Sequence, residues 1–318
     1  MLSLINNKKS YENLTRKEAF NRAMEIINYK WSYNYKNTPS NIKLPYYLKE
    51  EKEYIGIPYC FGGRFSLDSS NVKDIKSFQH ALENNYYPGN INTNNGYVKN
   101  TAGLDCSGFI LSVFKIKENL STTSLHKYFY EIDIEDIKPM DILNSKGKHV
   151  YVYLGKTLDN KGIIILESTS NGLNKYKDKS VVNYKSNNAF KKDIEKEGYI
   201  PMRYKKIKGN FKSSFDSYEY NNEERYSKDI PKNKEIKGSL DYLEDIDYYK
   251  IDLNEVSYIY VNRLSKNQFI TIYNDEEEIV IDSEIKKEIK LKGDIYIKVN
   301  LNKSTLKDKN YSFTILNK

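Results

Sequence analysis

The last third of the chain is a run of short segments in which apolar and polar residues alternate. A period of two residues is that of a β-strand with one buried face, and several such strands separated by polar turns are typical of two packed sheets. We therefore predict an all-β sandwich over residues 232–318. The alternating segments are 248–253, 258–264, 268–273, 278–281, 294–300 and 311–316.

The part of the chain before the sandwich has a mixed pattern. Thr15 and Glu18 have the spacing of a capping box, and apolar residues then recur at helical spacing up to Trp31, so residues 15–31 are predicted to form an amphipathic helix. Residues 69–102 are rich in Asn, Ser and Gly, which indicates a long loop or insertion. Helical and strand patterns together predict an α+β domain.

The length and the patterning together predict two domains. The chain has 318 residues, which is enough for two separate cores. Residues 207–231 lack apolar periodicity and are expected to be a linker. The predicted organisation is thus an α+β domain over residues 1–206, a linker over 207–231 and the β-sandwich over 232–318.

Charge is distributed unevenly along the sequence. The formal net charge is +8, and charged residues make up 30% of the chain. Residues 228–318 carry 16 Lys and Arg against 17 Asp and Glu, which leaves 35 against 26, or +9, for residues 1–227. The basic part is suited to an anionic polymer such as nucleic acid or a wall polysaccharide, although a solvated lysine-rich surface explains the same numbers. No stretch approaches the roughly 20 apolar residues that cross a bilayer, so we expect no membrane span.

Few residues are available for metal chemistry or disulfides. The chain has two cysteines, Cys60 and Cys106, and three histidines, with no close pair among them. A disulfide framework and a four-thiolate zinc site are therefore excluded, and no cofactor is expected in the first domain.

Cys106 lies in the most informative segment, Leu104-Asp-Cys-Ser-Gly-Phe109. Residues 109–114 have helical spacing, so Cys106 is expected at the start of a helix. Free N–H groups and the positive end of the helix dipole favour a thiolate there. A nucleophilic cysteine also needs a base, and the base needs an orienting group.

His149 and Glu167 are the candidates for the base and the orienting group. Residues 149–155 and 163–168 read as two strands joined by a turn at 159–162. A register that pairs odd-numbered with odd-numbered residues places Glu167 on the His149 face, whereas a slip by one residue sends it to the opposite face. The sequence leaves this register open.

These residues occur within a longer series of motifs. Over residues 14–206 the chain resembles the NlpC-type, papain-like cysteine peptidases and amidases of bacterial cell walls. The matching segments are Gly56-Ile-Pro-Tyr-Cys-Phe-Gly-Gly63, Leu104-Asp-Cys-Ser-Gly-Phe109, Lys138-Pro-Met-Asp-Ile142, His149-Val-Tyr-Val-Tyr-Leu-Gly155, Ile165-Leu-Glu-Ser168 and Gly198-Tyr-Ile-Pro-Met-Arg-Tyr204.

The resemblance implies a papain-like domain with helices and an antiparallel sheet that cuts amide bonds in peptidoglycan stem peptides. Cys106 would be the nucleophile, His149 the base and Glu167 the orienting residue. Tyr59 matches a tyrosine beside the thiol that helps to stabilise the oxyanion. The residues that match Asp105 and Ser107 grip the free amine of the substrate in some members.

This chain departs from the family at three places. Met140 replaces a glycine, Tyr151 replaces a small residue, and the segment from Ser69 to Thr101 is longer than in most members. Two other functions remain open: a catalytically inactive wall-binding or adhesion protein, and another papain-like acyl transferase or amidase. Cys60 is expected to be a packed free thiol.

The predicted sandwich resembles the bacterial pre-peptidase C-terminal domain. The resemblance rests on residues 238–251, 293–299 and 311–315. Some relatives bind calcium through acidic turns. A structural calcium in this chain would be bound by oxygens of four acidic residues. The alternative is that these residues form a solvated acidic turn. These residues are Asp241, Glu244, Asp245 and Asp247.

Such domains occur on exported enzymes, so we expect a secreted or wall-associated protein. Residues 1–9 contain no apolar core of a signal peptide, and the expectation is that a leader is absent from this sequence. The expected partners are stem peptides and a wall polymer, not nucleic acid, and the protein is expected to be a monomer.

Overall fold

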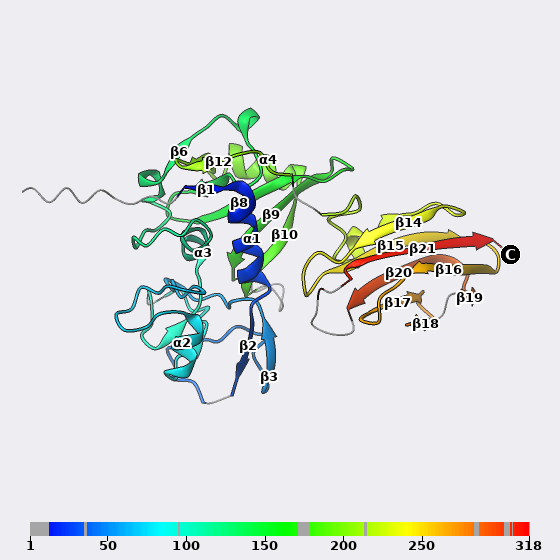
Figure 1. Ribbon diagram of the computed structural model, residues 1–318, viewed down its shortest axis with the longest axis horizontal. Coiled ribbons are helices and arrows are strands. Elements are labelled where there is room, and N and C mark those ends of the chain that lie inside the picture. Colours follow the sequence, from blue (N-terminus) through cyan, green and yellow to red (C-terminus); the bar gives the residue numbers. More distant parts are fainter. Residues whose placement is uncertain are drawn as a thin grey trace, which may run out of the picture. The chain divides into compact units, whose positions relative to one another are not determined.

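The computed structural model describes most of the chain. The described residues are 13–34, 37–94, 96–170, 178–212, 215–282, 286–301, 306 and 308–317. Their regular elements are mostly β-strands arranged in several sheets, with few helices (Figure 1). Two compact units are formed, one by residues 1–155 and 165–212 and the other by residues 156–164 and 213–318.

A six-stranded sheet in the order β10-β9-β8-β7-β11-β6 is central to the first part of the chain. The pairs β6 with β11, β11 with β7, and β7 with β8 are antiparallel. The strands are β6 (Phe129–Glu131), β7 (Ile142–Ser145), β8 (His149–Lys156), β9 (Gly162–Thr169), β10 (Lys179–Ser186) and β11 (Ile200–Tyr204).

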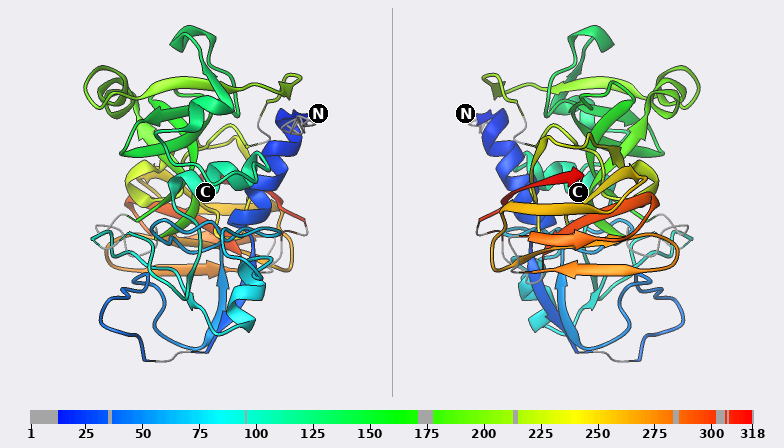
Figure 2. Two further views of the ribbon diagram at one scale, coloured as in Figure 1. Left: turned by 90° about the vertical axis from the view of Figure 1, so that its left-hand side faces the viewer. Right: turned by 90° about the vertical axis from the view of Figure 1, so that its right-hand side faces the viewer.

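Helices α1 (Arg16–Ile27) and α3 (Cys106–Val113) contribute the apolar faces of the first core. Ala19, Ala23 and Ile26 of α1 are fully buried, and α1 lies along one side of its unit (Figures 1 and 2). In α3 every residue after Cys106 is buried. Helix α4 (Asn187–Glu195) follows β10.

The first helix is shorter than predicted. The capping box of Thr15 and Glu18 is present, but α1 ends at Ile27. Trp31 lies instead in β2 (Lys30–Tyr33), which pairs with β3 (Lys52–Ile55). There the indole N–H of Trp31 donates a hydrogen bond of 2.9 Å to the Gly56 carbonyl, which satisfies the polar atom of a buried side chain.

The expected insertion at 69–102 contains regular structure. It includes α2 (Phe78–Glu83) and the strands β4 (Tyr87–Pro88) and β5 (Thr101–Ala102), which pair in parallel. The Phe78 ring is buried and packs edge-on against Trp31, with 5.3 Å between the ring centroids. One buried aromatic contact therefore anchors a segment whose polar composition indicates a loop.

The second unit contains two sheets that share one apolar core, which is the arrangement of a β-sandwich. One sheet has the order β13-β15-β20-β17-β18 and the other β14-β21-β16-β19. The strands are β13 (Lys228–Asp229), β14 (Glu235–Ser239), β15 (Ile246–Leu253), β16 (Ser257–Arg263), β17 (Gln268–Tyr273), β18 (Glu278–Ile281), β19 (Lys286–Ile289), β20 (Gly293–Leu301) and β21 (Asn310–Asn317).

Part of the segment expected as a linker is ordered. β12 (Ile207–Lys208) pairs with β1 (Leu14–Thr15), and Ile230 belongs to the sandwich core. Glu219 and Tyr220 are each only 4% exposed. Isolated buried side chains keep this stretch ordered, so its order produces no apolar periodicity in the sequence.

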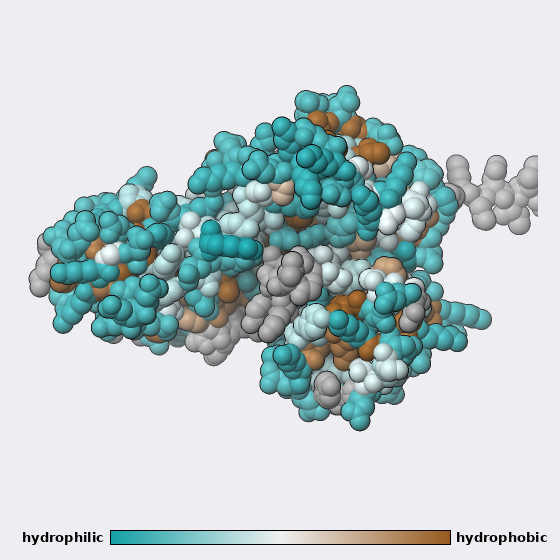
Figure 3. All heavy atoms as spheres, turned by 180° about the vertical axis from the view of Figure 1, so that it is seen from behind, coloured by the Kyte–Doolittle hydropathy of each residue, from teal (hydrophilic) through white to brown (hydrophobic). Residues whose placement is uncertain are grey.

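The face of the molecule drawn in Figure 3 is predominantly hydrophilic. On the face drawn in Figure 3, hydrophobic residues form small separate areas within a hydrophilic surround. Among the described residues, no helix combines the length and the apolar composition needed to cross a bilayer.

Candidate active site and candidate metal centre

The N-terminus of α3 positions Cys106. Asp105 is the N-cap residue, and its Oδ1 accepts hydrogen bonds from the Gly108 N–H at 2.5 Å and the Ser107 hydroxyl at 2.8 Å. Cys106 is the first residue of the helix and is partly exposed, unlike the seven helix residues that follow it. Its N–H group is one of those at a helix start that have no partner within the helix, and it is therefore available to an oxyanion.

The glycine-rich loop before α3 lies directly against the helix. The N–H of Asp105 donates to the carbonyl of Gly63 at 3.0 Å. A Cβ on Gly108 would lie 2.4 Å from that same carbonyl oxygen, a separation that no real side chain tolerates. Glycine at position 108 therefore permits the close approach that fixes the loop against the helix that begins at Cys106.

Strands β8 and β9 bring His149 and Glu167 together. The Nε2 atom of His149 lies 2.7 Å from Oε2 of Glu167. Burial alone would lower the pKa of His149, but hydrogen bonds with the Cys106 side chain and with Glu167 outweigh it and raise the pKa to about 10. The imidazole is therefore held between the cysteine and the carboxylate, on the face that the odd-with-odd register predicts.

Glu167 is held at its second oxygen by Asn183 of β10. The amide nitrogen of Asn183 donates to Oε1 of Glu167 at 2.6 Å. Burial alone would raise the pKa of Glu167, but the hydrogen bond and charge of His149, together with Asn183, lower the pKa to about 2. The carboxylate is thus ionised, and both of its oxygens are oriented.

Sequence reasoning missed Asn183. Its only signal is a polar residue in a strand that otherwise begins with buried positions. Such a residue is equally consistent with an exposed strand end, so the pairing with Glu167 needs the three-dimensional arrangement of β9 and β10.

Tyr59 lies close enough to Cys106 and Asp105 for their charges to act on it. Its backbone N–H donates to the Asp178 carbonyl at 2.8 Å, and its side chain forms a hydrogen bond with Ser170. Burial, followed by the charges of Cys106 and Asp105, raises the pKa of Tyr59, so the hydroxyl stays protonated and can donate.

Asp105 and Ser107 occupy the helix cap. Ser107 is 2% exposed and Asp105 8% exposed, and the hydroxyl of Ser107 is directed to Oδ1 of Asp105. In this arrangement Ser107 supports the cap.

Tyr151, which departs from the family pattern, has a structural partner. Its ring is fully buried, and its hydroxyl donates to Oδ2 of Asp193 in α4 at 2.8 Å. Lys185 lies 2.6 Å from the same carboxylate oxygen and 4.8 Å above the Tyr151 ring. The large residue thus connects β8 to α4 beside the His149 strand.

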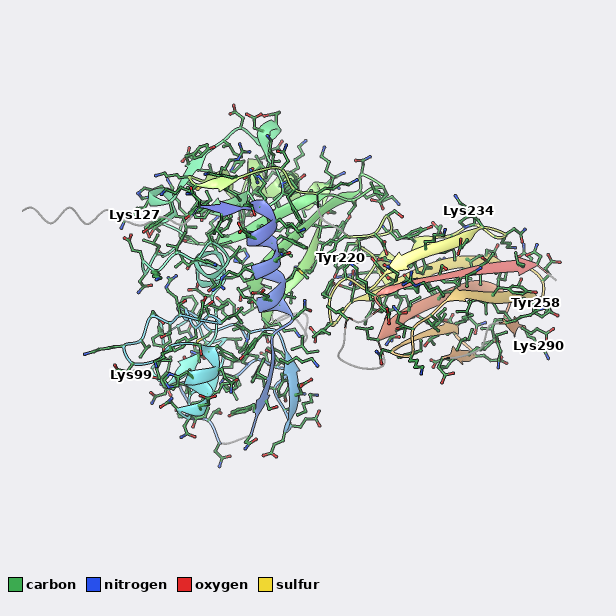
Figure 4. The ribbon with its side chains drawn as sticks, viewed as in Figure 1. Lys99, Lys127, Tyr220, Lys234, Tyr258 and Lys290 are labelled. Atoms are coloured by element: carbon green, nitrogen blue, oxygen red, sulfur yellow. The ribbon has the colours of Figure 1, made fainter. Side chains whose placement is uncertain are left out.

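A second group of polar side chains lies in the β-sandwich unit. One carboxylate oxygen each from Glu219, Asp245 and Asp247 lies within 4.8 Å of the other two. Asp245 and Asp247 are 1% and 0% exposed, so they do not form a solvated turn. Tyr220, the neighbour of Glu219 in the chain, lies at the end of the sandwich opposite Tyr258 (Figure 4).

The remaining residues named as calcium ligands lie outside this group. Asp241 forms an ion pair with Lys309, and Glu244 is exposed. Glu219 was not predicted, because it lies in the stretch expected to be a linker.

The three clustered carboxylates suit a hard cation. Burial raises the pKa of Asp245 to about 8 and the pKa values of Glu219 and Asp247 well above the usual range, because like charges are confined without water. Oε1 of Glu219 and Oδ1 of Asp247 are buried without a hydrogen-bond partner among the described residues, as are Oδ1 of Asn221 and Asn222. Carboxylate and amide oxygens of this kind are the ligands that Ca²⁺ prefers.

Comparison with known proteins finds similarity only among solved structures. No family model matches the chain, and no curated protein matches it. A crystal structure of the pre-peptidase C-terminal domain of collagenase from Bacillus anthracis is similar at 17% sequence identity, with a TM-score of 0.25. The similarity covers 28% of this chain and 93% of that one.

Proposed function

We propose that this protein is a cysteine hydrolase whose catalytic residues are Cys106, His149 and Glu167. The observation that carries the proposal is the position of the His149 imidazole, whose Nε2 lies 2.7 Å from Glu167 and whose pKa is raised by both Glu167 and the neighbouring Cys106 side chain. A thiol, a base and a group that orients the base are the components of nucleophilic catalysis by cysteine.

The reaction follows from these contacts. The imidazolium of His149 stabilises a Cys106 thiolate, and the thiolate attacks the carbonyl carbon of an amide. Tyr59 and the Cys106 N–H donate to the resulting oxyanion. His149 then gives its proton to the leaving amine, and it accepts a proton from the water that hydrolyses the thioester. Glu167, itself held by Asn183, keeps the imidazole oriented.

We propose peptidoglycan stem peptides as the substrate and a papain-like, NlpC-type fold for the first unit. The support is the series of motifs from Gly56 to Tyr204. The same reasoning makes the protein a secreted or wall-associated hydrolase.

Digestion of purified cell walls tests this proposal. Wild-type protein should release muropeptides with newly formed amine and carboxyl ends, as measured by mass spectrometry. Cys106→Ala should release none, and His149→Ala should reduce the rate by about 10²–10⁴-fold because the proton transfers are lost. Cys60→Ser is the matched control and should remain active.

Two results would reject parts of this assignment. Release of the same fragments by Cys106→Ala would exclude Cys106 as the nucleophile. Products that carry an added acyl acceptor in place of a free carboxylate would identify an acyl transferase on the same residues.

Thiol labelling separates an active enzyme from an inactive wall-binding protein. Cys60 is fully buried, and burial raises its pKa to about 12, so it should react slowly with iodoacetamide at neutral pH. Cys106 is partly exposed and adjoins His149. If Cys106 reacts no faster than a cysteine in an unfolded peptide, the thiol is not activated and the inactive protein is favoured.

We also propose that the sandwich unit binds Ca²⁺ through Glu219, Asp245 and Asp247. The specific support is the buried carboxylate group and its unpartnered oxygens. The cation would neutralise charges that otherwise repel one another, and it would thereby stabilise the fold.

Thermal unfolding of the full chain tests the calcium proposal. Ca²⁺ should raise the melting temperature relative to the same protein in EGTA. A free Ca²⁺ concentration of about 100 times Kd would raise the free energy of unfolding by about 2.7 kcal/mol. The double variant Asp245→Asn/Asp247→Asn should lose this response, whereas Asp252→Asn/Glu255→Gln, at exposed positions, should keep it. No shift in the wild-type protein would show that Ca²⁺ does not bind.

A further inference from the structure

The first unit contains a cavity of about 700 Å³ that the proposed reaction does not use. One wall is the segment from Asp68 to Lys76, and the other is formed by α3 and the residues after it, up to Asn119. The first wall belongs to the segment that is longer in this chain than in the family it resembles.

The cavity lies on the side of α3 away from the nucleophile. Gly108, Leu111 and Ser112 line it, and they follow Cys106 by two, five and six positions. At about 100° per residue, these positions lie between about 140° and 240° around the helix axis from Cys106. The cavity is therefore separate from the surface on which Cys106 acts.

Four cationic side chains line this cavity without forming an ion pair among the described residues. Arg64, Lys73, Lys76 and Lys117 form no ion pair with any residue in the described part of the chain. The cavity's two acidic residues each pair with a cation outside the lining. Arg22 is bound to Asp68, and Lys127 lies 2.7 Å from Glu118.

Arg64 gives the cavity a partly desolvated cation. Its Nη1 atom is buried and has no hydrogen-bond partner among the residues that the structure describes. Burial lowers the pKa of Arg64, while the charges of Asp105 and Cys106 oppose this effect. Buried donors in folded proteins nearly always have an acceptor, and a guanidinium is well matched to the oxygens of phosphate or carboxylate.

We propose that this cavity binds a compact anion with several negative charges, carried by phosphate or carboxylate groups. Arg64 lines the cavity beside the two walls and contributes positive charge, and Lys73, Lys76 and Lys117 supply charge from both walls. The hydroxyl of Ser69 and the amide of Asn119 add neutral donors. Cations on both walls favour a ligand that carries more than one anionic group.

Calorimetric titration of the full chain carrying Cys106→Ala tests the proposal. Inorganic pyrophosphate and citrate are the two probes, used in buffer and protein freed of divalent cations on a chelating resin so that neither acts through a bound cation. At least one should bind, and the triple variant Lys73→Gln/Lys76→Gln/Lys117→Gln should weaken that binding by at least about tenfold. The probe that binds more tightly distinguishes phosphate from carboxylate recognition.

A matched triple variant controls for the loss of net charge. Lys17→Gln/Lys99→Gln/Lys146→Gln removes the same charge at exposed positions outside the cavity, and Lys99 extends away from its unit in Figure 4. This control should weaken binding less than about twofold at moderate salt. Equal weakening by the two triples, or no binding of either probe to the starting protein, would overturn the proposal. Lys117→Gln alone should also weaken binding. This single variant keeps the proposal testable if the triple variant does not fold.

Discussion

At the scale of single residues, the imidazole of His149 and the carboxylate of Glu167 hold one another in their charged forms. Their separation of 2.7 Å and the burial of Glu167 make the interaction strong, because water screens it only in part. Each partner therefore shifts the protonation of the other, and this coupling links catalysis to the stability of the fold.

Glu167→Gln should lower the free energy of unfolding by an amount that depends on pH. The pKa of Glu167 falls from 4.5 to about 2, so its contribution is complete above pH 4.5 and is lost as the pH falls through 2. The pKa of His149 rises from 6.5 to about 10, so its contribution is complete below pH 6.5 and is lost as the pH rises through 10. The loss in the free energy of unfolding relative to wild type should therefore be largest between pH 4.5 and pH 6.5, at about 1–3 kcal/mol.

Urea unfolding at a series of pH values measures this difference. Glu25→Gln changes an exposed glutamate on α1 and should have a small effect that is similar at every pH. A difference between Glu167→Gln and wild type that stays constant from pH 4 to pH 10 would contradict the coupling of the two charges.

At the scale of secondary-structure elements, the contact between β8 and α4 depends on one hydroxyl. Tyr151→Phe removes the donor to Asp193 and leaves a largely buried carboxylate with Lys185 as its remaining partner. We expect a loss of about 1–3 kcal/mol in the free energy of unfolding, measured by urea denaturation.

Tyr153→Phe is the matched control on the same strand. Its hydroxyl makes no hydrogen bond with another described residue, so the change should cost less than about 0.5 kcal/mol. Equal losses in the two variants would mean that the hydrogen bond to Asp193 does not stabilise the contact between β8 and α4.

Elements with a strong local period are predicted well from the sequence. The strands of the sandwich and the start of α1 follow from alternation and from the capping box. Trp31 was assigned to the helix because its spacing suits a helix face, but its hydrogen bond to Gly56 and its packing against Phe78 place it in β2. Tertiary contacts override local periodicity at that position.

Sites that join distant segments are predicted only in part. Cys106, His149 and Glu167 each lie in a recognisable motif, and only the strand register was left open. Asn183 and Glu219 have no such context. Asn183 contacts Glu167, which is 16 positions away in the chain, and Glu219 is buried beside Asp245, which is 26 positions away. A sequence carries no local signal for a partner of this kind.

At the scale of the whole molecule, the positive charge and the proposed catalytic residues belong to the same part of the chain. Cys106, His149, Glu167 and Asn183 all lie in the first unit. Residues 1–227 carry a net charge of +9, whereas residues 228–318 carry −1. The sandwich therefore has little long-range attraction for an anionic wall, and any help that it gives must come from specific contacts or from tethering.

A chain of residues 1–212 should retain hydrolysis of a soluble stem peptide but lose efficiency on intact walls. All residues proposed for the reaction remain in this fragment, and the specific wall contacts of the sandwich are removed. Wall association of both forms should weaken with salt, because the Debye length falls from about 10 Å at 0.1 M to about 3 Å at 1 M. Rates on both substrates at the two salt concentrations, with sedimentation of the walls to measure bound protein, check these expectations. Hydrolysis of the soluble peptide should change little with salt. If the fragment is folded by circular dichroism and yet inactive on the soluble peptide, the sandwich contributes to the active site and the two units do not act independently.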